Sequence, residues 1–135
     1  MHRYDAFTER IARAVFAYTE ARLREEPVPL DHGVAASTLD ERAPSLIRPE
    51  GNDPEVVMQQ YRDVLSLAVF SCDSPRFLAF IPAAPTKAAL LFDTVVSASS
   101  LSGISWLEAA GAVHAENQTL RFLADLAGLP PSAGG

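Results

Sequence analysis

Cysteine and lysine are nearly absent from this chain, and each shortage excludes a kind of chemistry. Cys72 is the one cysteine in 135 residues, so no internal disulfide framework can form, and the composition suits a reducing compartment. No base lies near this thiol in the sequence to activate it, so we expect a small apolar residue rather than a nucleophile. Lys87 is the one lysine, and a solvated surface charge is the expected role there.

Positive charge is also in short supply. With 11 basic and 17 acidic residues the net charge is −6, and the arginines are interleaved with acids rather than forming the basic stripe of a nucleic-acid-binding surface. The most apolar region, residues 88–113, is interrupted by Asp93 and Glu108, which makes it a poor membrane span. Residues 1–26 carry charge throughout, unlike a signal peptide. We therefore expect a cytoplasmic protein without a nucleic-acid or membrane partner.

Motifs of a self-contained active site are missing as well. The sequence contains no phosphate-binding glycine loop, no nucleophile elbow and no histidine pair at metal-ligand spacing. Several serines lie between residues 97 and 105, but no base is spaced to activate any of them. We expect no catalytic, cofactor-binding or metal-ligating residue in this chain.

The sequence is rich, however, in helical periodicity. Apolar residues recur every three or four positions from about Asp5, a suitable N-cap, to Arg24. This stripe either docks on another subunit or domain or packs within a small bundle, and composition favours neither. A second helix is expected to begin with Asp53 as its cap and Pro54 in its first position, and its apolar stripe continues to Ala68.

Two more helices are expected in the second half of the chain. One covers about 86–99 and should be buried because it is apolar on every face, and the other runs from about 106 to 127, where glycine and proline stop it. The proline- and glycine-rich connector 27–52 has room for a helical turn near residues 38–42. Residues 77–81, FLAFI, could form a short strand. The predicted fold class is mainly α.

The connection formed by residues 73–86, DSPRFLAFIPAAPT, is unusual for a loop. Loops that merely join helices are normally polar because their backbone faces water, whereas this one is apolar and stiffened by three prolines. Such a loop is either covered by another part of the protein or forms the wall of a pocket.

Three stretches together resemble the N-terminal part of the group II pyridoxal-phosphate-dependent amino-acid decarboxylases, which include the aromatic-L-amino-acid, histidine and glutamate decarboxylases. The stretches are DSPRFLAFIPAAPT, SGISWLEAAGAVHAE and LADLAGLPPSAGG. The matching positions are Pro75, Phe77, Ala79, Phe80 and Pro82, then Gly103, Ser105 and Trp106, then Glu116, and finally Leu126, Gly128, Leu129 and Pro130. Each motif is weak alone, but their order and spacing make the combination fairly specific.

The resemblance implies a parent assembly with an α/β architecture, the transferase-like fold type I of pyridoxal-phosphate enzymes. It divides the chain into an amphipathic helix over 1–26, a dimer-clasping connector and helix over 27–72, and the beginning of the large cofactor-binding domain over 73–135. The implied activity is that of a carboxy-lyase acting on a small amino acid, with aromatic side chains preferred. The implied substrate-contacting residues are Phe80, Pro82, Ala83 and Ile104.

The family's cofactor lysine and the residues around it lie beyond the part that this chain resembles, and Lys87 matches none of them. We therefore expect pyridoxal 5′-phosphate to be bound mainly by residues outside the chain. The expected assembly is of the homodimer type, completed by the C-terminal remainder of the same enzyme, and the chain by itself should be inactive and poorly soluble. The alternatives are a non-catalytic helical interaction or regulatory module derived from such an enzyme, and a plain helical bundle.

Four departures from the family pattern leave the substrate open. Asp73 stands where a histidine is common, and Ala83 where the aromatic decarboxylases often have threonine. Phe80 replaces a frequent tyrosine, and Ile104 replaces a phenylalanine that in the family reaches into the neighbouring subunit's site.

Overall fold

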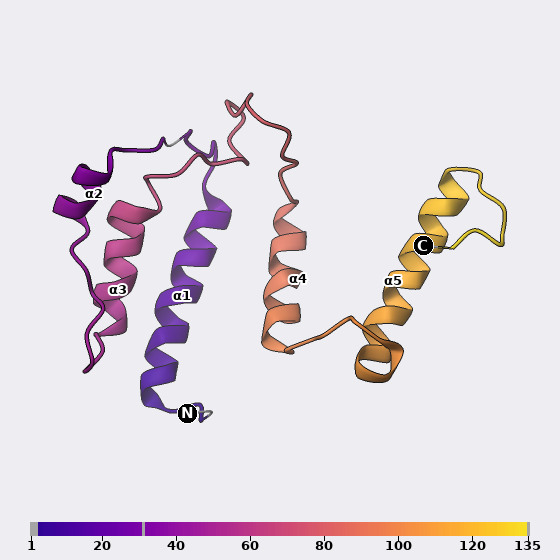
Figure 1. Ribbon diagram of the computed structural model, residues 1–135, viewed down its shortest axis with the longest axis horizontal. Helices are drawn as coiled ribbons and strands as arrows, with labels where there is room; N and C mark the ends of the chain where they lie inside the picture. Colours follow the sequence, from indigo (N-terminus) through magenta and orange to yellow (C-terminus); the bar gives the residue numbers. More distant parts are fainter. Residues whose placement is uncertain (1–2, 31, 135) are drawn as a thin grey trace. The chain divides into compact units, whose positions relative to one another are not determined.

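The computed structural model describes residues 3–30 and 32–134, which divide between Pro85 and Thr86 into two compact units (Figure 1). This described part of the chain is helical and contains no strand, which confirms the predicted helical character. Residues 1, 2 and 135, at the ends of the predicted first and last segments, and Asp31 of the connector lie outside it. The predicted functional divisions at 26/27 and 72/73 stay predictions.

The first unit begins with helix α1, Ala6–Arg24. As predicted, Asp5 is its N-cap, because the Asp5 carboxylate accepts a hydrogen bond of 2.9 Å from the backbone N–H of Thr8. The chain leaves the helix in an extended conformation at Glu25, two residues before Pro27. A short helix α2, Ala36–Arg42, then confirms the helical turn expected near 38–42.

Helix α3, Pro54–Gln60, starts as predicted, with Asp53 accepting a 3.0 Å hydrogen bond from Glu55 N–H. The prediction of one α-helix continuing to Ala68 is wrong, because α3 passes into a single π-helical segment, η1, Tyr61–Leu65. Its wider turn is closed by a 2.8 Å bond from the Ser66 N–H to the Tyr61 carbonyl, five residues back. The Ser66 hydroxyl also donates to the Arg62 carbonyl at 2.9 Å, a backbone acceptor that a regular helix would use itself.

Helices α1 and α3 run side by side in the first unit, and α2 packs on η1 (Figure 1). Tyr18 of α1 and Tyr61 of η1 meet edge to face, with ring centroids 5.3 Å apart. One side of the α1 stripe is therefore covered within the chain. Phe7 and Phe16 remain 52% and 63% exposed, so other parts of the surface of α1 are uncovered in the described unit.

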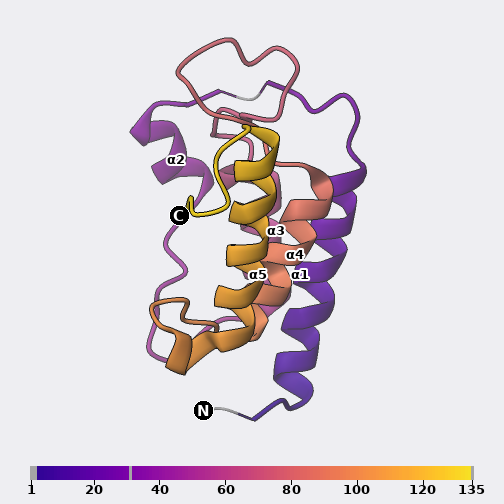
Figure 2. The same ribbon diagram turned by 90° about the vertical axis from the view of Figure 1, so that its right-hand side faces the viewer.

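The second unit contains helices α4, Lys87–Ala98, and α5, Trp106–Leu126. Thr86 caps α4 and Ser105 caps α5, each by accepting a hydrogen bond from a backbone N–H three residues on. Non-helical backbone at Ala109 bends α5, and Figure 2 shows its first turn set at an angle to the remainder.

Helix α5 ends where glycine and proline predicted a stop. Gly128 adopts φ +68°, its N–H donates to the Asp125 carbonyl at 3.0 Å, and the Leu129 N–H donates to the Ala124 carbonyl at 2.9 Å. These two bonds form a Schellman motif, which satisfies carbonyls that the helix end would otherwise leave unpaired.

Two predictions for the second half of the chain are wrong. Residues 77–81 do not form a strand, and 79–81 bend instead, because a strand needs a neighbouring strand and the described residues provide none. Helix α4 is not buried: every one of its residues is exposed in the described unit. Its all-round apolar composition requires a covering surface, which these residues do not supply.

Candidate functional site

The apolar loop predicted as a pocket wall follows a turn at residues 71–77 in which Ser71 and Ser74 are buried. Ser71 and Ser74 are 8% and 5% exposed, and Val28 of the connector, which is hydrogen-bonded to Ser74, is 8% exposed. The Ser74 hydroxyl donates a 2.9 Å hydrogen bond to the Val28 carbonyl and accepts one of 3.3 Å from the Arg76 N–H. Two backbone hydrogen bonds complete the turn: the Ser74 N–H donates to the Ser71 carbonyl at 2.9 Å, and the Phe77 N–H donates to the Ser74 carbonyl at 3.0 Å.

An ion pair ties the same turn to the end of α1. Arg22 Nη2 lies 2.7 Å from Asp73 Oδ1, and the two side chains are only 31% and 33% exposed. Hydrogen bonding to Asp73 raises the pKa of Arg22. We call Arg22, Val28, Asp73 and Ser74 the loop anchor. Residues this far apart in sequence give no local signal, although the Ser74–Pro75 dipeptide does indicate a turn.

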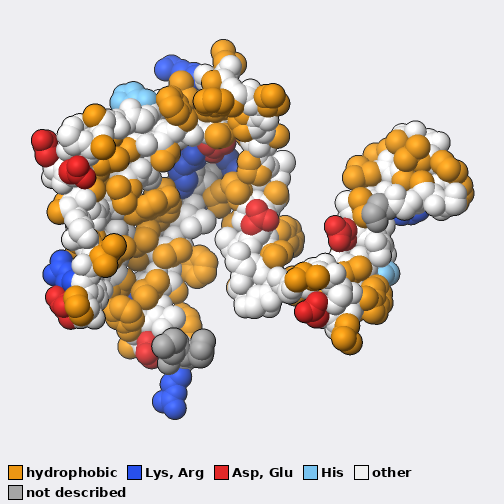
Figure 3. Space-filling view, viewed as in Figure 1, with side chains coloured by type: hydrophobic (Ala, Val, Ile, Leu, Met, Phe, Trp, Pro, Cys, Tyr) orange, Lys and Arg blue, Asp and Glu red, His pale blue; other side chains and the backbone are white. Residues whose placement is uncertain are grey.

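Beyond the anchor, residues 77–83 carry only apolar side chains, and we call this segment the apolar wall. Leu78, Phe80 and Ile81 are 94%, 85% and 102% exposed, and Pro82 and Ala83 are exposed as well. Figure 3 shows hydrophobic side chains gathered over this loop. The wall can pack against an apolar group, but it contains no acid, base or nucleophile that could transfer a proton or form a covalent intermediate.

Phe80 holds an unusual backbone conformation within the wall. Its φ of +59° lies in the left-handed region, which a bulky side chain rarely adopts and which costs on the order of 1–3 kcal/mol. Its ring leans toward Phe77, with centroids 6.2 Å apart. Strained residues of this kind cluster at functional sites, which makes Phe80 the most distinctive of the predicted contact residues.

The four predicted substrate-contacting residues fall in both units. Phe80, Pro82 and Ala83 belong to the apolar wall of the first unit, whereas Ile104 lies in the second, just before Ser105 caps α5. Ile104 is 85% exposed. Ser105 has a local structural role, because its hydroxyl also donates to the Glu108 carboxylate at 2.8 Å. The contacts of all four residues with a substrate stay predictions.

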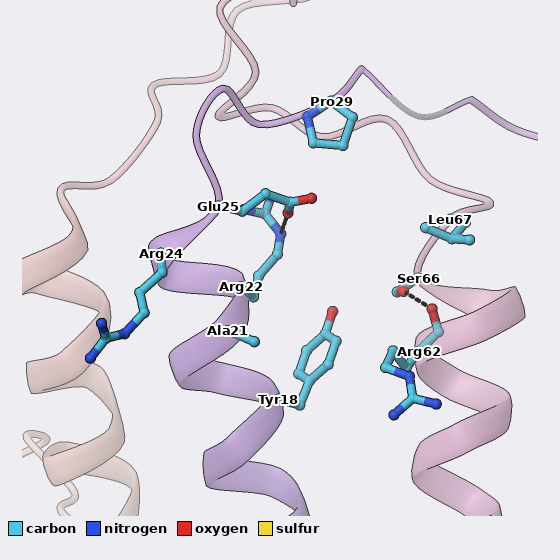
Figure 4. Close-up of a pocket in the computed structure, with 9 residues that line it drawn as sticks. All are labelled: Tyr18, Ala21, Arg22, Arg24, Glu25, Pro29, Arg62, Ser66 and Leu67. Atoms are coloured by element: carbon cyan, nitrogen blue, oxygen red, sulfur yellow. Dashed lines mark hydrogen bonds and ion pairs between the residues drawn. The ribbon is translucent and has the colours of Figure 1, made fainter.

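A cavity of about 350 Å³ lies elsewhere in the first unit, between the end of α1 and η1 (Figure 4). Its lining includes Tyr18 and three arginines, which suggests an anion site. Each arginine already has a carboxylate partner, however: Arg22 has Asp73, while Arg24 and Arg62 lie 2.6 Å from Glu20 and Asp63. The cavity therefore offers little uncompensated positive charge to an anionic ligand.

Within the described residues, no group of three or more histidine, cysteine or acidic side chains could hold a metal ion. No helix of that same part combines the length and apolar composition needed to cross a membrane.

Comparison with characterised proteins finds similarity to decarboxylases and to a synthase. The chain is 27% identical over 115 residues to the aromatic-L-amino-acid decarboxylase of Bacillus atrophaeus, covering 84% of this chain and 23% of that protein. It is 27% identical over 100 residues to the 4-hydroxyphenylacetaldehyde synthase of Rhodiola rosea, covering 74% and 20% of the two proteins. For the L-tyrosine/L-DOPA decarboxylase 2 of Lophophora williamsii the identity is 23% over 104 residues, covering 77% and 20%.

The chain thus spans about a fifth of the length of these relatives. No family model matches it, and no solved structure does. The similarity to three such proteins nevertheless confirms the resemblance predicted from the loop, turn and helix-end motifs. The chain is therefore similar to a small part of aromatic-L-amino-acid decarboxylase-like proteins, in agreement with the group II resemblance read from its motifs.

Proposed function

We propose that this chain supplies a substrate-facing wall and part of the dimer interface of a pyridoxal-phosphate-dependent decarboxylase of aromatic amino acids. In this proposal it is active only together with the C-terminal remainder of the enzyme, in the cytoplasm. One observation carries the proposal: the apolar wall exposes Leu78, Phe80 and Ile81 almost completely while its base is anchored and buried. Such a surface needs an apolar group to cover it.

The described residues do not fit the cofactor itself. Pyridoxal-phosphate enzymes bind the cofactor aldehyde through a lysine, and the one lysine here, Lys87, is the exposed first residue of α4. The apolar wall contains no charged side chain that could bind the phosphate or the pyridine nitrogen of the cofactor. The cofactor site and the bond-breaking step are therefore assigned to other polypeptide, and this chain contributes binding and water exclusion.

The wall would act by packing against the substrate side chain. Full burial of an aromatic or large aliphatic group contributes about 1.5–3 kcal/mol. Pro82 restricts the backbone of the wall, so less conformational entropy is lost when a ligand binds. An apolar wall separates substrates that differ by one methylene only about 10–200-fold. Phe80 and Ala83 present no hydroxyl, so selection among aromatic side chains rests on shape.

The helices of the second unit would be covered by the remainder of the enzyme. The large apolar side chains of α4 are 36–71% exposed, and those at the two ends of α5 are 53–93% exposed. In the first unit, Phe7 and Phe16 of α1 are more than half exposed, and one or both would face the partner subunit. Obligate interfaces of this apolar character are usually large.

Co-expression tests the proposal. The chain is produced with and without the polypeptide encoded downstream, and the purified protein is examined for the absorption of bound pyridoxal phosphate and for carbon dioxide release from aromatic amino acids. The proposal predicts both only for the complex. A stable complex that never takes up the cofactor would contradict it and favour the non-catalytic interaction module, which the exposed apolar helices also permit.

The wall is tested in the assembled enzyme by Ala83→Thr and Phe80→Tyr. Each adds a hydroxyl to the wall, so kcat/KM should shift between phenylalanine-like and hydroxylated aromatic substrates. Thr94→Ser, in α4 and outside the wall, serves as the control. An unchanged substrate preference in both wall variants would remove these residues from the substrate contact.

A further inference from the structure

We propose that Arg22 and Ser74 are positioning residues that hold the backbone of the apolar wall in place and thereby determine how the wall contacts the substrate. This inference rests on the proposed function, because it gives the wall a substrate to contact. It assigns a role to two residues that are not among the positions matching the family pattern.

The first argument is the contrast in burial along a short stretch of chain. Ser74 is 5% exposed, whereas Leu78, four residues later, is 94% exposed. The side chains that would meet a ligand therefore make few contacts of their own in this chain. Their position depends on the buried turn from which they rise.

The second argument is that the hydroxyl, the backbone N–H and the backbone carbonyl of Ser74 all form hydrogen bonds within the chain. Its hydroxyl bonds Val28 and Arg76, its N–H bonds the Ser71 carbonyl, and its own carbonyl accepts from Phe77, all at 2.9–3.3 Å. The Val28 bond joins segments 46 residues apart. Phe77, the first residue of the apolar wall, is thus linked through Ser74 to the connector that follows α1.

The third argument is the Arg22–Asp73 ion pair, which adds charge to the same junction. The pair joins residues 51 positions apart in the sequence, with 2.7 Å between Arg22 Nη2 and Asp73 Oδ1, and both side chains are about two-thirds buried. Solvent and salt therefore weaken this pair less than they weaken the exposed ion pairs of α1. Asp73 is also one of the positions that departs from the family pattern. An acid at this position gives Arg22 a charged partner, which ties helix α1 directly to the loop.

The experiment compares anchor variants within the complex of the chain and its downstream polypeptide. Asp73→Asn removes the charge but keeps the size, and Ser74→Ala removes the hydroxyl. Ser74→Thr retains a hydroxyl, and the exchanged pair Arg22→Asp with Asp73→Arg restores the attraction. Glu20→Gln, which breaks the exposed Glu20–Arg24 pair on the same helix, is the matched control.

Two readouts are measured, and the first is independent of activity. Hydrogen exchange of the amides in residues 76–83 should accelerate in Asp73→Asn and Ser74→Ala, and return toward the native rate in Ser74→Thr and in the exchanged pair. KM for aromatic amino acids should rise about fivefold in the first two variants, while kcat changes less than twofold. Glu20→Gln should change neither readout.

Unchanged exchange in both anchor variants overturns the inference, and so does faster exchange with unchanged KM. The two proposals fail differently. If the wild-type complex takes up no cofactor, the proposed function fails, and the exchange rates still decide whether Arg22 and Ser74 hold the loop.

Discussion

Arg10 of α1 binds both acidic residues that begin α3: its Nη2 lies 2.5 Å from Asp53 Oδ2 and 2.6 Å from Glu55 Oε2. Hydrogen bonding with the Glu55 side chain, with Arg10 and with the Glu55 N–H lowers the pKa of Asp53 to about 2. Asp53 also caps α3, so one carboxylate both starts a helix and joins it to its neighbour.

This arrangement predicts how stability of the first unit depends on pH. The pKa of Asp53 is lower in the folded chain than in the unfolded chain, where it is about 3.9. The ionised form therefore favours folding above about pH 4, and this contribution is lost as the pH falls toward about 2. Urea unfolding followed by circular dichroism should show the midpoint falling over this range.

Asp53→Asn is the matched variant, because asparagine keeps the N-cap but has no titrating carboxylate. Its midpoint should be lower than that of the wild type at neutral pH and fall less steeply in acid. Arg10→Gln should also flatten the dependence. Parallel pH profiles for the wild type and Asp53→Asn would contradict the prediction.

A second prediction concerns the backbone of Phe80. Because its φ is +59°, Phe80→Gly removes a steric cost and leaves the free energy of unfolding unchanged or higher. Leu78→Gly, at an exposed neighbour without a positive φ, should lower it by about 0.5–1 kcal/mol. Chemical unfolding of the complex measures both, and a larger loss in Phe80→Gly than in Leu78→Gly would show that the strain is absent.

Two glycines of the second unit should respond to alanine with opposite signs. A Cβ at either would meet open space, so only the backbone decides. Gly128 has φ +68°, and Gly128→Ala should cost about 1–2 kcal/mol and fray the end of α5. Gly111 lies inside α5, and Gly111→Ala should stabilise it by about 0.5–1 kcal/mol. Helicity and unfolding midpoints by circular dichroism test the pair, and equal signs would contradict the assignment.

A fourth prediction concerns the exposed side of α4. Phe92 and Val95 are 71% and 56% exposed and lie three residues apart on the helix. The double change Phe92→Ser with Val95→Ser should reduce binding of an apolar dye by the chain alone. It should also weaken association with the downstream polypeptide at least tenfold, since burial of each side chain is worth about 1.5–3 kcal/mol. Thr94→Ser is the control, and titration by light scattering or calorimetry gives the affinity.

The helix starts were predictable because their signals are local. Asp5 and Asp53 accept the backbone hydrogen bonds expected of caps, and the Gly128 stop has the expected left-handed backbone. In each case the residue type and its position within a few residues of a periodic segment determine the structure.

The errors concern interactions that no local pattern contains. Residues 77–81 have the composition of a strand but no neighbour to pair with, and α4 has the composition of a buried helix but no cover in the described unit. The Arg22–Asp73 pair was missed for a related reason, since the two residues are 51 positions apart. The family resemblance located the apolar wall, whereas the packing that holds its base became visible only in three dimensions.

The π-helical turn at Tyr61–Leu65 bears on how this part of the chain can vary in length. A turn closed over five residues holds one more residue than an α-helical turn closed over four. Deleting Asp63 should therefore convert the π-helical segment into an ordinary α-helix. Among relatives of this chain, one-residue gaps in aligned sequences should gather at this point rather than within the regular turns of α3.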